Sequence, residues 1–217
     1  YRNTTGSNNA AMGSNALGKN TTGYNNTSSG SFSLYQNTTG KRNSATGSNA
    51  LNKNISGSSN VANGYETLYS NTRGSNNTAS GSYALNKNTT GKNNTANGYG
   101  ALYSNTNGRN NTAVGSGALN RNTSGSYNIA SGADALYSNR TGSNNLAIGR
   151  NAGRSNNGSS NIFIGSNSCS ALTNSSNSLC IGGTNPLISG NFLTQRVLID
   201  GTVVITGDLY VSGAIYE

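Results

Sequence analysis

Leucine and alanine recur at every seventeenth position along the chain, separated by stretches made almost wholly of Asn, Ser, Thr and Gly. The consensus is Gly-x-Asn-Asn-x-Ala-x-Gly-x-x-Ala-Leu-x-x-Asn-x-x, and its register holds for nine copies before two degenerate ones at 161–165 and 178–182. Short apolar alternation broken by Gly and Asn is typical of short strands joined by tight turns. We therefore expect an all-β chain, a parallel β-solenoid of about eleven 17-residue repeats over residues 1–182.

Three kinds of position recur in this register. Glycine is expected to supply positive φ at corners, and alanine to fill a narrow interior. The expected core comprises Leu17, Leu34, Leu51, Leu68, Leu85, Leu102, Leu119, Leu136, Cys169 and Cys180. A structural ladder of amides paired along the stack is expected at Asn20, Asn37, Asn54, Asn71, Asn88, Asn105, Asn122 and Asn139. For the two cysteines, free buried side chains and a disulfide both remain open.

The core of one chain looks small for its length. Each 17-residue coil buries a single leucine, which returns far less free energy than the ordering of the coil costs. A core shared between chains, with the Leu and Ala faces of several copies meeting on a common axis, would remove this deficit. The expected assembly is therefore an obligate homo-oligomer, a homotrimer.

A second, 34-residue period is laid over the first. Tyr follows Leu in every second repeat, and Lys or Arg lies two residues after Leu in the repeats between. With a 17-residue coil these tyrosines and cations would alternate along one edge, whereas a 34-residue coil would place them in two separate ladders. The 34-residue coil would stack cations at ~4.8 Å, where like charges repel, so the 17-residue coil is favoured. The residues expected to form a surface or glycan contact are Tyr35, Tyr69, Tyr103, Tyr137, Lys19, Lys53, Lys87 and Arg121. The alternative is that the tyrosines have a purely structural role and only cover neighbouring backbone.

The period changes near the C-terminus. Residues 183–190 are expected to be a transition that contains Pro186. Beyond it, glycines at 201, 207 and 213 separate short runs rich in β-branched and aromatic residues, which cannot bury themselves as single hairpins. Residues 191–217 are thus expected to form an intertwined, triple-stranded trimeric β module with a six-residue period.

Composition excludes most chemistry. Hydrophobic residues make up 31% and charged residues 9%, and the chain has no His and five acidic residues. Hydrolase sites that need His are excluded, and neither an enzyme, a metal site nor a cofactor is expected. The net charge of +9 comes from single, scattered cations, which does not favour nucleic-acid binding. No apolar stretch approaches the ~18–20 residues of a membrane span, so no membrane insertion is expected. Because Tyr1 lies inside a repeat, we expect a soluble piece of a longer chain.

The repeats carry a resemblance. Phrases such as Asn94-Thr-Ala-Asn-Gly-Tyr-Gly-Ala-Leu-Tyr-Ser-Asn105 and Asn145-Leu-Ala-Ile-Gly149 look like repeats of bacteriophage tail-fibre-like proteins and, more loosely, head repeats of trimeric autotransporter adhesins. Residues 200–216 are similar to the stretch that often precedes an endosialidase-type intramolecular chaperone in tail fibres. The resemblance implies a homotrimer outside the cell, on a virion tail fibre or cell-surface appendage, with a C-terminal chaperone removed on maturation.

The function expected from residues and resemblance together is non-enzymatic. The chain would be a structural, receptor-contacting fibre segment that adheres multivalently to a cell-surface glycan or protein receptor. Two alternatives remain open, a self-assembling extracellular filament subunit and a bacterial trimeric surface adhesin. An uncapped solenoid edge, which can template another chain, would favour the filament.

Overall fold

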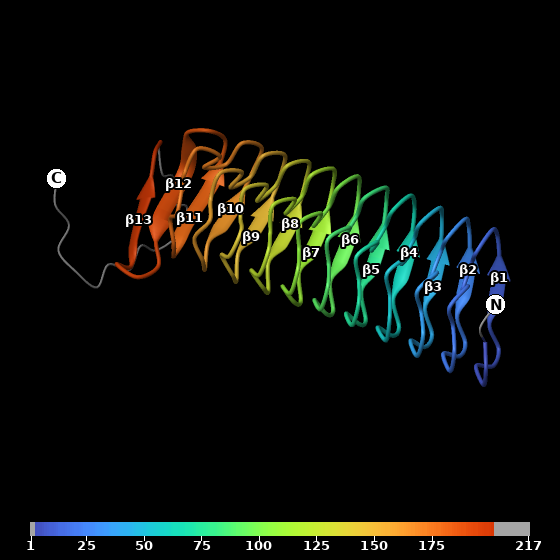
Figure 1. Ribbon diagram of the computed structural model, residues 1–217. Helices are drawn as coiled ribbons and strands as arrows, with labels where there is room; N and C mark the ends of the chain where they lie inside the picture. The colour runs from blue at the N-terminus through green and yellow to red at the C-terminus, as the bar shows by residue number, and fades with distance from the viewer. Residues whose placement is uncertain (1–2, 202–217) are drawn as a thin grey trace, which may run out of the picture.

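The structure, a computed structural model, describes residues 3–201, and they form a single sheet of 13 strands that pair in chain order (Figure 1). No helix occurs within this range. The strands are β1 Ala10–Met12, β2 Thr27–Ser29, β3 Ser44–Thr46, β4 Val61–Asn63, β5 Thr78–Ser80, β6 Thr95–Asn97, β7 Thr112–Val114, β8 Ile129–Ser131, β9 Leu146–Ile148, β10 Ile162–Ile164, β11 Ser178–Gly182, β12 Pro186–Asn191 and β13 Arg196–Ile199.

The solenoid makes one turn per 17-residue repeat. Ala45 pairs with Ala62, and Ala62 with Ala79, in parallel strands. The 34-residue coil is thereby excluded, and the predicted all-β parallel solenoid is confirmed for the described residues. β1 to β11 are all parallel, separated by about ten turns. Figure 1 shows these coils stacked in one row from the N-terminal end to the C-terminal end.

The predicted core leucines lie inside a single chain. Every leucine of the row from Leu34 to Leu136 is fully buried, and Leu17 is 1% exposed. Alanines such as Ala84 and Ala96 fill the rest of the interior. The expectation that these faces meet those of other chains on a common axis is therefore wrong, because one chain already closes around them. Leu85 has φ +51°, a left-handed conformation that L residues adopt at a cost, so burial outweighs local strain at this position.

Both glycine rows lie where neighbouring coils approach closely, and one row also has positive φ; a Cβ on Gly47 would lie 2.5 Å from the carbonyl oxygen of Gly64. Gly47 has φ +124°, as expected for a corner that disfavours a side chain. Gly91, from the other row, does not have positive φ; instead a Cβ there would lie 2.6 Å from the carbonyl oxygen of Gly108 and 2.7 Å from Nδ2 of Asn105. In this second row, glycine permits the close approach of neighbouring coils.

The predicted asparagine ladder is present and buried. Nδ2 of Asn88 donates to Oδ1 of Asn71 at 2.8 Å and to the carbonyl oxygen of Gly91 at 3.2 Å. The same pair of bonds recurs at each coil of this row from Asn20 to Asn139. These amides are therefore structural and closed to ligands.

A second asparagine ladder runs beside the first. The backbone N–H and Nδ2 of Asn94 both donate to Oδ1 of Asn77, at 3.0 and 3.1 Å, and Nδ2 also donates to the carbonyl oxygen of Gly108 at 2.9 Å. Its buried members are Asn26, Asn43, Asn60, Asn77, Asn94, Asn111, Asn128, Asn145 and Asn161. Each such bond contributes on the order of 1 kcal/mol net. Together with the backbone ladder, these amides stabilise an interior that has few large apolar side chains.

One coil near the C-terminal end is a residue shorter than the others. Leu146 pairs with Ile162, one position short of the usual 17-residue step. In this region Gly153 takes the leucine slot and Phe163 takes an alanine slot. A Cβ on Gly153 would collide with the Phe163 ring, so the large and the small residue are exchanged within one packed layer.

The shorter coil breaks the first amide ladder. Asn156 would be the next member after Asn139, but its Nδ2 donates to the carbonyl oxygen of Ser175 at 3.0 Å and its Oδ1 accepts from the backbone N–H of Gly158. Oδ1 of Asn139 is consequently buried without a hydrogen-bond partner among the described residues. This position is a weak point in an otherwise satisfied interior.

The parallel stack ends at β11. β12 and β13 continue the same sheet in antiparallel pairing, so the chain reverses direction in the short turn before Pro186. The segment 183–190, expected to be a transition, therefore contains that turn and most of β12. Of the predicted six-residue module 191–217, β13 is described, and residues 202–217 lie outside the described part of the chain.

Cys169 and Cys180 form a disulfide, which decides between the two possibilities left by the sequence. Cys180 is 3% exposed and belongs to the core, whereas Cys169 is half-buried beside it. The bond joins residues 11 positions apart, from the last leucine slot to β11.

Replacing both cysteines by alanine is expected to destabilise the C-terminal coils by about 2–3 kcal/mol, because the bond restricts the unfolded chain. Thermal unfolding with and without dithiothreitol measures this effect: the midpoint of the native chain should fall in reductant, and that of the double variant should not change. The N-terminal coils should retain their protection from hydrogen exchange, because each coil contacts only its neighbours. Equal midpoints for both proteins in both buffers would contradict a stabilising disulfide.

Candidate functional site

The predicted tyrosine and cation positions lie along one edge of the solenoid, where each predicted cation caps the ring of the next coil. Nζ lies 4.9 Å from the ring centroid for Lys19 over Tyr35, 4.8 Å for Lys53 over Tyr69 and 5.0 Å for Lys87 over Tyr103. Arg121 and Arg154 each lie 5.0 Å from the centroid of Tyr137. These distances fall within the ~6 Å range of cation–π attraction. We call this set of tyrosines and cations the Tyr–cation edge.

The tyrosine rings of this edge are partly buried by packing against neighbouring coils. Tyr35, Tyr69, Tyr103 and Tyr137 are half-buried, whereas their cations are exposed. A Cβ on Gly18 would lie 3.0 Å from the ring carbons of Tyr35, so the absence of a side chain makes room for the ring. In alternate coils an asparagine takes the tyrosine position; Nδ2 of Asn52 donates to the carbonyl oxygen of Phe32 at 3.0 Å. Each ring is thus half-buried and has a cation of the preceding coil over it.

Charge along the edge is almost entirely positive. Within residues 3–201 the solenoid carries two acidic residues before residue 190, Glu66 and Asp134. Asp134 lies 3.8 Å from Arg154 in an exposed ion pair, worth at most ~1 kcal/mol. Glu66 raises the pKa of Tyr65 above 10.0, mainly because its carboxylate hydrogen-bonds the Tyr65 hydroxyl. The edge therefore offers cations and aromatic faces, without a carboxylate pair for acid–base chemistry.

A second group of tyrosines was not predicted. Tyr83 makes edge-to-face contacts with Tyr65, Tyr99 and Tyr103, with centroid distances of 5.4, 5.8 and 6.4 Å. All of these except Tyr103 lie outside the predicted tyrosine row, so a search confined to that row passes over them. Their signal in the sequence is the local excess of tyrosine between 65 and 103, at positions where the other coils rarely have an aromatic residue.

A row of threonines was also missed. Oγ1 of Thr72 donates to the carbonyl oxygen of Thr89 at 3.0 Å, and Oγ1 of Thr89 to that of Thr106 at 2.9 Å. These hydroxyls are occupied with backbone of the next coil, so the row is structural.

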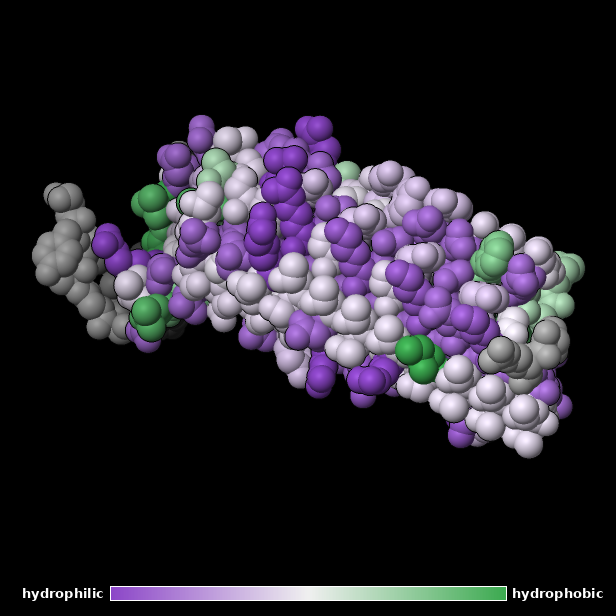
Figure 2. All heavy atoms as spheres, in the orientation of Figure 1, coloured by the Kyte–Doolittle hydropathy of each residue, from purple (hydrophilic) through white to green (hydrophobic). Residues whose placement is uncertain are grey.

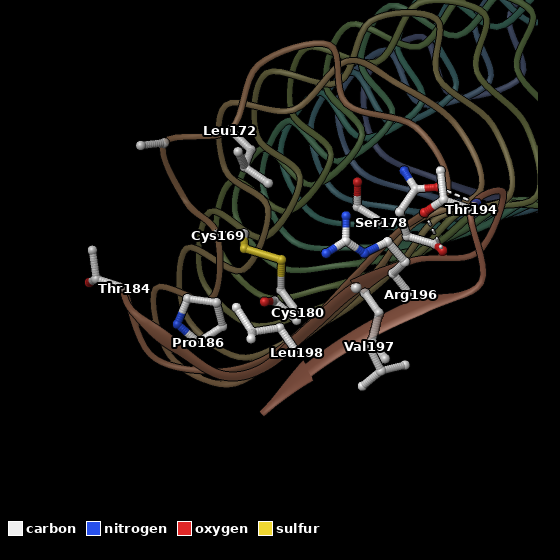
Figure 3. Close-up of a pocket in the computed structure, with 15 residues that line it drawn as sticks. Cys169, Leu172, Ser178, Cys180, Thr184, Pro186, Thr194, Arg196, Val197 and Leu198 are labelled. Atoms are coloured by element: carbon white, nitrogen blue, oxygen red, sulfur yellow. Dashed lines mark hydrogen bonds between the residues drawn. A yellow bond between two sulfur atoms is a disulfide. The ribbon is translucent and has the colours of Figure 1, made fainter. Parts of the chain in front are cut away.

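A hollow of about 740 Å³ lies at the C-terminal end of the solenoid between the disulfide and β12–β13 (Figure 3). Cys169, Leu172, Pro186 and Leu198 line it, and Arg196 is its one charged residue. Apolar side chains around the disulfide form one part of its lining, and Ser178, Thr194 and Arg196 lie together in another part (Figure 3).

Residues 3–201 contain no helix long and apolar enough to cross a membrane, and no group of His, Cys, Asp or Glu side chains arranged to hold a metal ion. Comparison of the chain with protein-family models, curated proteins and solved structures finds no match. The likeness to tail fibres and adhesin heads therefore rests on the repeat residues alone.

Proposed function

We propose that the chain is a non-enzymatic fibre segment of a phage tail fibre or related extracellular appendage, which presents a rigid rod to a cell surface. The Tyr–cation edge is the observation that carries this proposal. It repeats one contact unit every two coils, about 9–10 Å, along a stack held by hydrogen bonds between every pair of coils. Weak contacts repeated in fixed geometry add through avidity without a deep pocket.

The C-terminal strands support a homotrimer as the assembled form. Large apolar side chains are exposed on β12, β13 and the turn between them: Leu187 62%, Phe192 47%, Leu193 79%, Val197 63%, Leu198 66% and Ile199 46%. The face drawn in Figure 2 is mainly hydrophilic, and hydrophobic side chains are visible towards both ends of the molecule. Neighbouring copies that meet through β12–β13 would cover a surface that a single chain leaves in water. The resemblance of residues 200–216 supports a chaperone that follows this segment and is removed on maturation.

Solution mass and negative-stain imaging of the full chain test the assembly. We expect a discrete trimer whose solenoid is about 50 Å long, from about ten turns at ~4.8 Å. Long unbranched polymers would instead favour the filament, and a stable monomer would overturn the trimer. The extracellular adhesin alternative predicts the same mass, so cell binding must be measured separately.

Adhesion is tested with a triple variant, Tyr35→Ala, Tyr69→Ala and Tyr137→Ala. Binding of the labelled protein to a panel of bacterial cells is expected to fall at least about tenfold, because three contact units are removed from each chain. The unfolding midpoint should change little, since these rings are only half-buried. Tyr127→Ala, which removes a 62%-exposed tyrosine outside the edge, is the matched control. Unchanged adhesion by a folded triple variant would return these tyrosines to the role of covering backbone.

A further inference from the structure

The second tyrosine group is placed differently from the Tyr–cation edge. Tyr65 and Tyr99 occupy the same position in coils two apart, and Tyr83 lies between them in the intervening coil. The rings of both pairs meet at 83°, so each contact covers at most one ring face and leaves others open. Tyr65 is 44% and Tyr99 64% exposed, which makes this the most aromatic part of the described solenoid surface.

A hollow of about 400 Å³ opens beside these rings, lined by Tyr83, Tyr99, Gly100, Tyr103 and Asn120. Its floor exists because Gly100 stands where most other coils have a side chain, for example Asn49 or Phe32. Gly100 has φ +61°, and these two residues have φ +59° and +54° at the equivalent positions. The hollow thus forms because Gly100 has no side chain, while the backbone at this position is the same as in the other coils.

One polar group is fixed over this floor. Nδ2 of Asn120 donates to the carbonyl oxygen of Gly100 at 2.9 Å, which holds the amide in place. No hydrogen bond to its Oδ1 is formed by the described residues, so this oxygen remains free to accept from a hydroxyl. The lining contains no charged side chain.

We propose that this hollow is a carbohydrate subsite that takes one neutral hexopyranose ring. The proposal rests on the proposed function and names the chemistry of the receptor. A pyranose has an apolar C–H face that stacks on tyrosine rings and a rim of hydroxyls that hydrogen-bond an amide and phenolic hydroxyls. The volume lies within the ~300–1,000 Å³ of small-molecule sites. The lining itself has no charged side chain, and the neighbouring Lys87 is engaged over the Tyr103 ring, with Nζ 5.0 Å from its centroid.

Saturation-transfer NMR on the full chain tests the site. The probes are the methyl glycosides of glucose, galactose and mannose at millimolar concentration, with adenosine as a planar comparator. We expect transfer to at least one glycoside, strongest at the protons of its apolar face, and a loss of at least about fivefold in Tyr99→Ala and in Gly100→Asn. Gly100→Asn fills the floor with the residue that already has this backbone conformation at Asn49. Its Cβ would lie 3.1 Å from Nδ2 of Asn120, a side-chain atom that can shift, so circular dichroism is used to check that the variant is folded.

Tyr127→Ala is the control, because it removes an equally exposed tyrosine away from the hollow and should leave transfer unchanged. Absence of transfer to all three glycosides, transfer to adenosine alone, or transfer that survives both hollow variants would overturn the proposal. Cell adhesion of Gly100→Asn separates the two proposals. If Gly100→Asn adheres to cells as strongly as the native chain, the subsite is not the receptor site, but the proposed fibre function stands. If the native chain binds a glycoside but adheres to no cells, the subsite stands and the proposed fibre function does not.

Discussion

Gly91→Ala is expected to lower the free energy of unfolding by about 3–5 kcal/mol, through overpacking and the loss of ladder hydrogen bonds. The added methyl group would contact Oδ1 of Asn88 and lie 2.6 Å from the carbonyl oxygen of Gly108. Backbone on the next coil cannot yield without parting the two coils. Chemical denaturation followed by circular dichroism measures the loss, and limited proteolysis should reveal new cleavage near residue 91.

Gly183→Ala is the matched control. Its Cβ would meet only the carbonyl oxygen of Ser166 at 3.8 Å, an ordinary contact, and its φ is not positive. We expect this variant to unfold within about 0.5 kcal/mol of the native chain. If Gly91→Ala were equally stable, close coil approach would not be the reason for the second glycine row.

Leu85→Asp is expected to cost more than about 5 kcal/mol and to unfold the central coils, because it removes a buried leucine and places a carboxylate in an apolar interior. Leu85 is fully buried by its own chain. A core shared between chains would predict a different result, a folded monomer that fails to assemble. Circular dichroism and light scattering on the same sample distinguish loss of fold from loss of assembly.

Leu85→Met keeps volume and apolarity at the same position and should cost less than about 1.5 kcal/mol. If Leu85→Asp has native circular dichroism and the mass of a monomer, the core is shared between chains, and the burial of Leu85 within its own chain is contradicted. Native circular dichroism at trimer mass would contradict both accounts.

The sequence predicted the fold well because its register is strict. A residue that recurs at every seventeenth position must occupy equivalent places in a stack, which is enough to assign the coil, the leucine row and the Asn20 ladder. The shared core was wrong for a physical reason. The burial of one leucine per coil understates the stability of a single chain, because two amide ladders and backbone bonds between coils contribute much of the stabilisation.

The candidate site was predictable only where it is periodic. Lys53 and Tyr69 keep a fixed spacing, so their adjacency on one edge followed once the 17-residue coil was chosen. The hollow beside Gly100 depends instead on a missing side chain next to rings that meet across coils. Gly117 repeats the missing side chain in the next coil, but the contacts of Tyr83 with Tyr99 and Tyr103 do not recur there. The antiparallel return of β12 was hidden because Pro186 and its neighbouring glycines are equally typical of a loop.

The backbone of this molecule repeats every 17 residues, whereas its Tyr–cation edge repeats every 34 residues. The coils are interchangeable to their neighbours, so gain or loss of one 17-residue copy would leave both amide ladders continuous. The same event would bring two tyrosines or two cations together at ~4.8 Å on the edge. Duplications that preserve the alternation of tyrosines and cations must therefore come in pairs of coils, so related solenoids with the same edge are expected to differ in length by 34-residue steps.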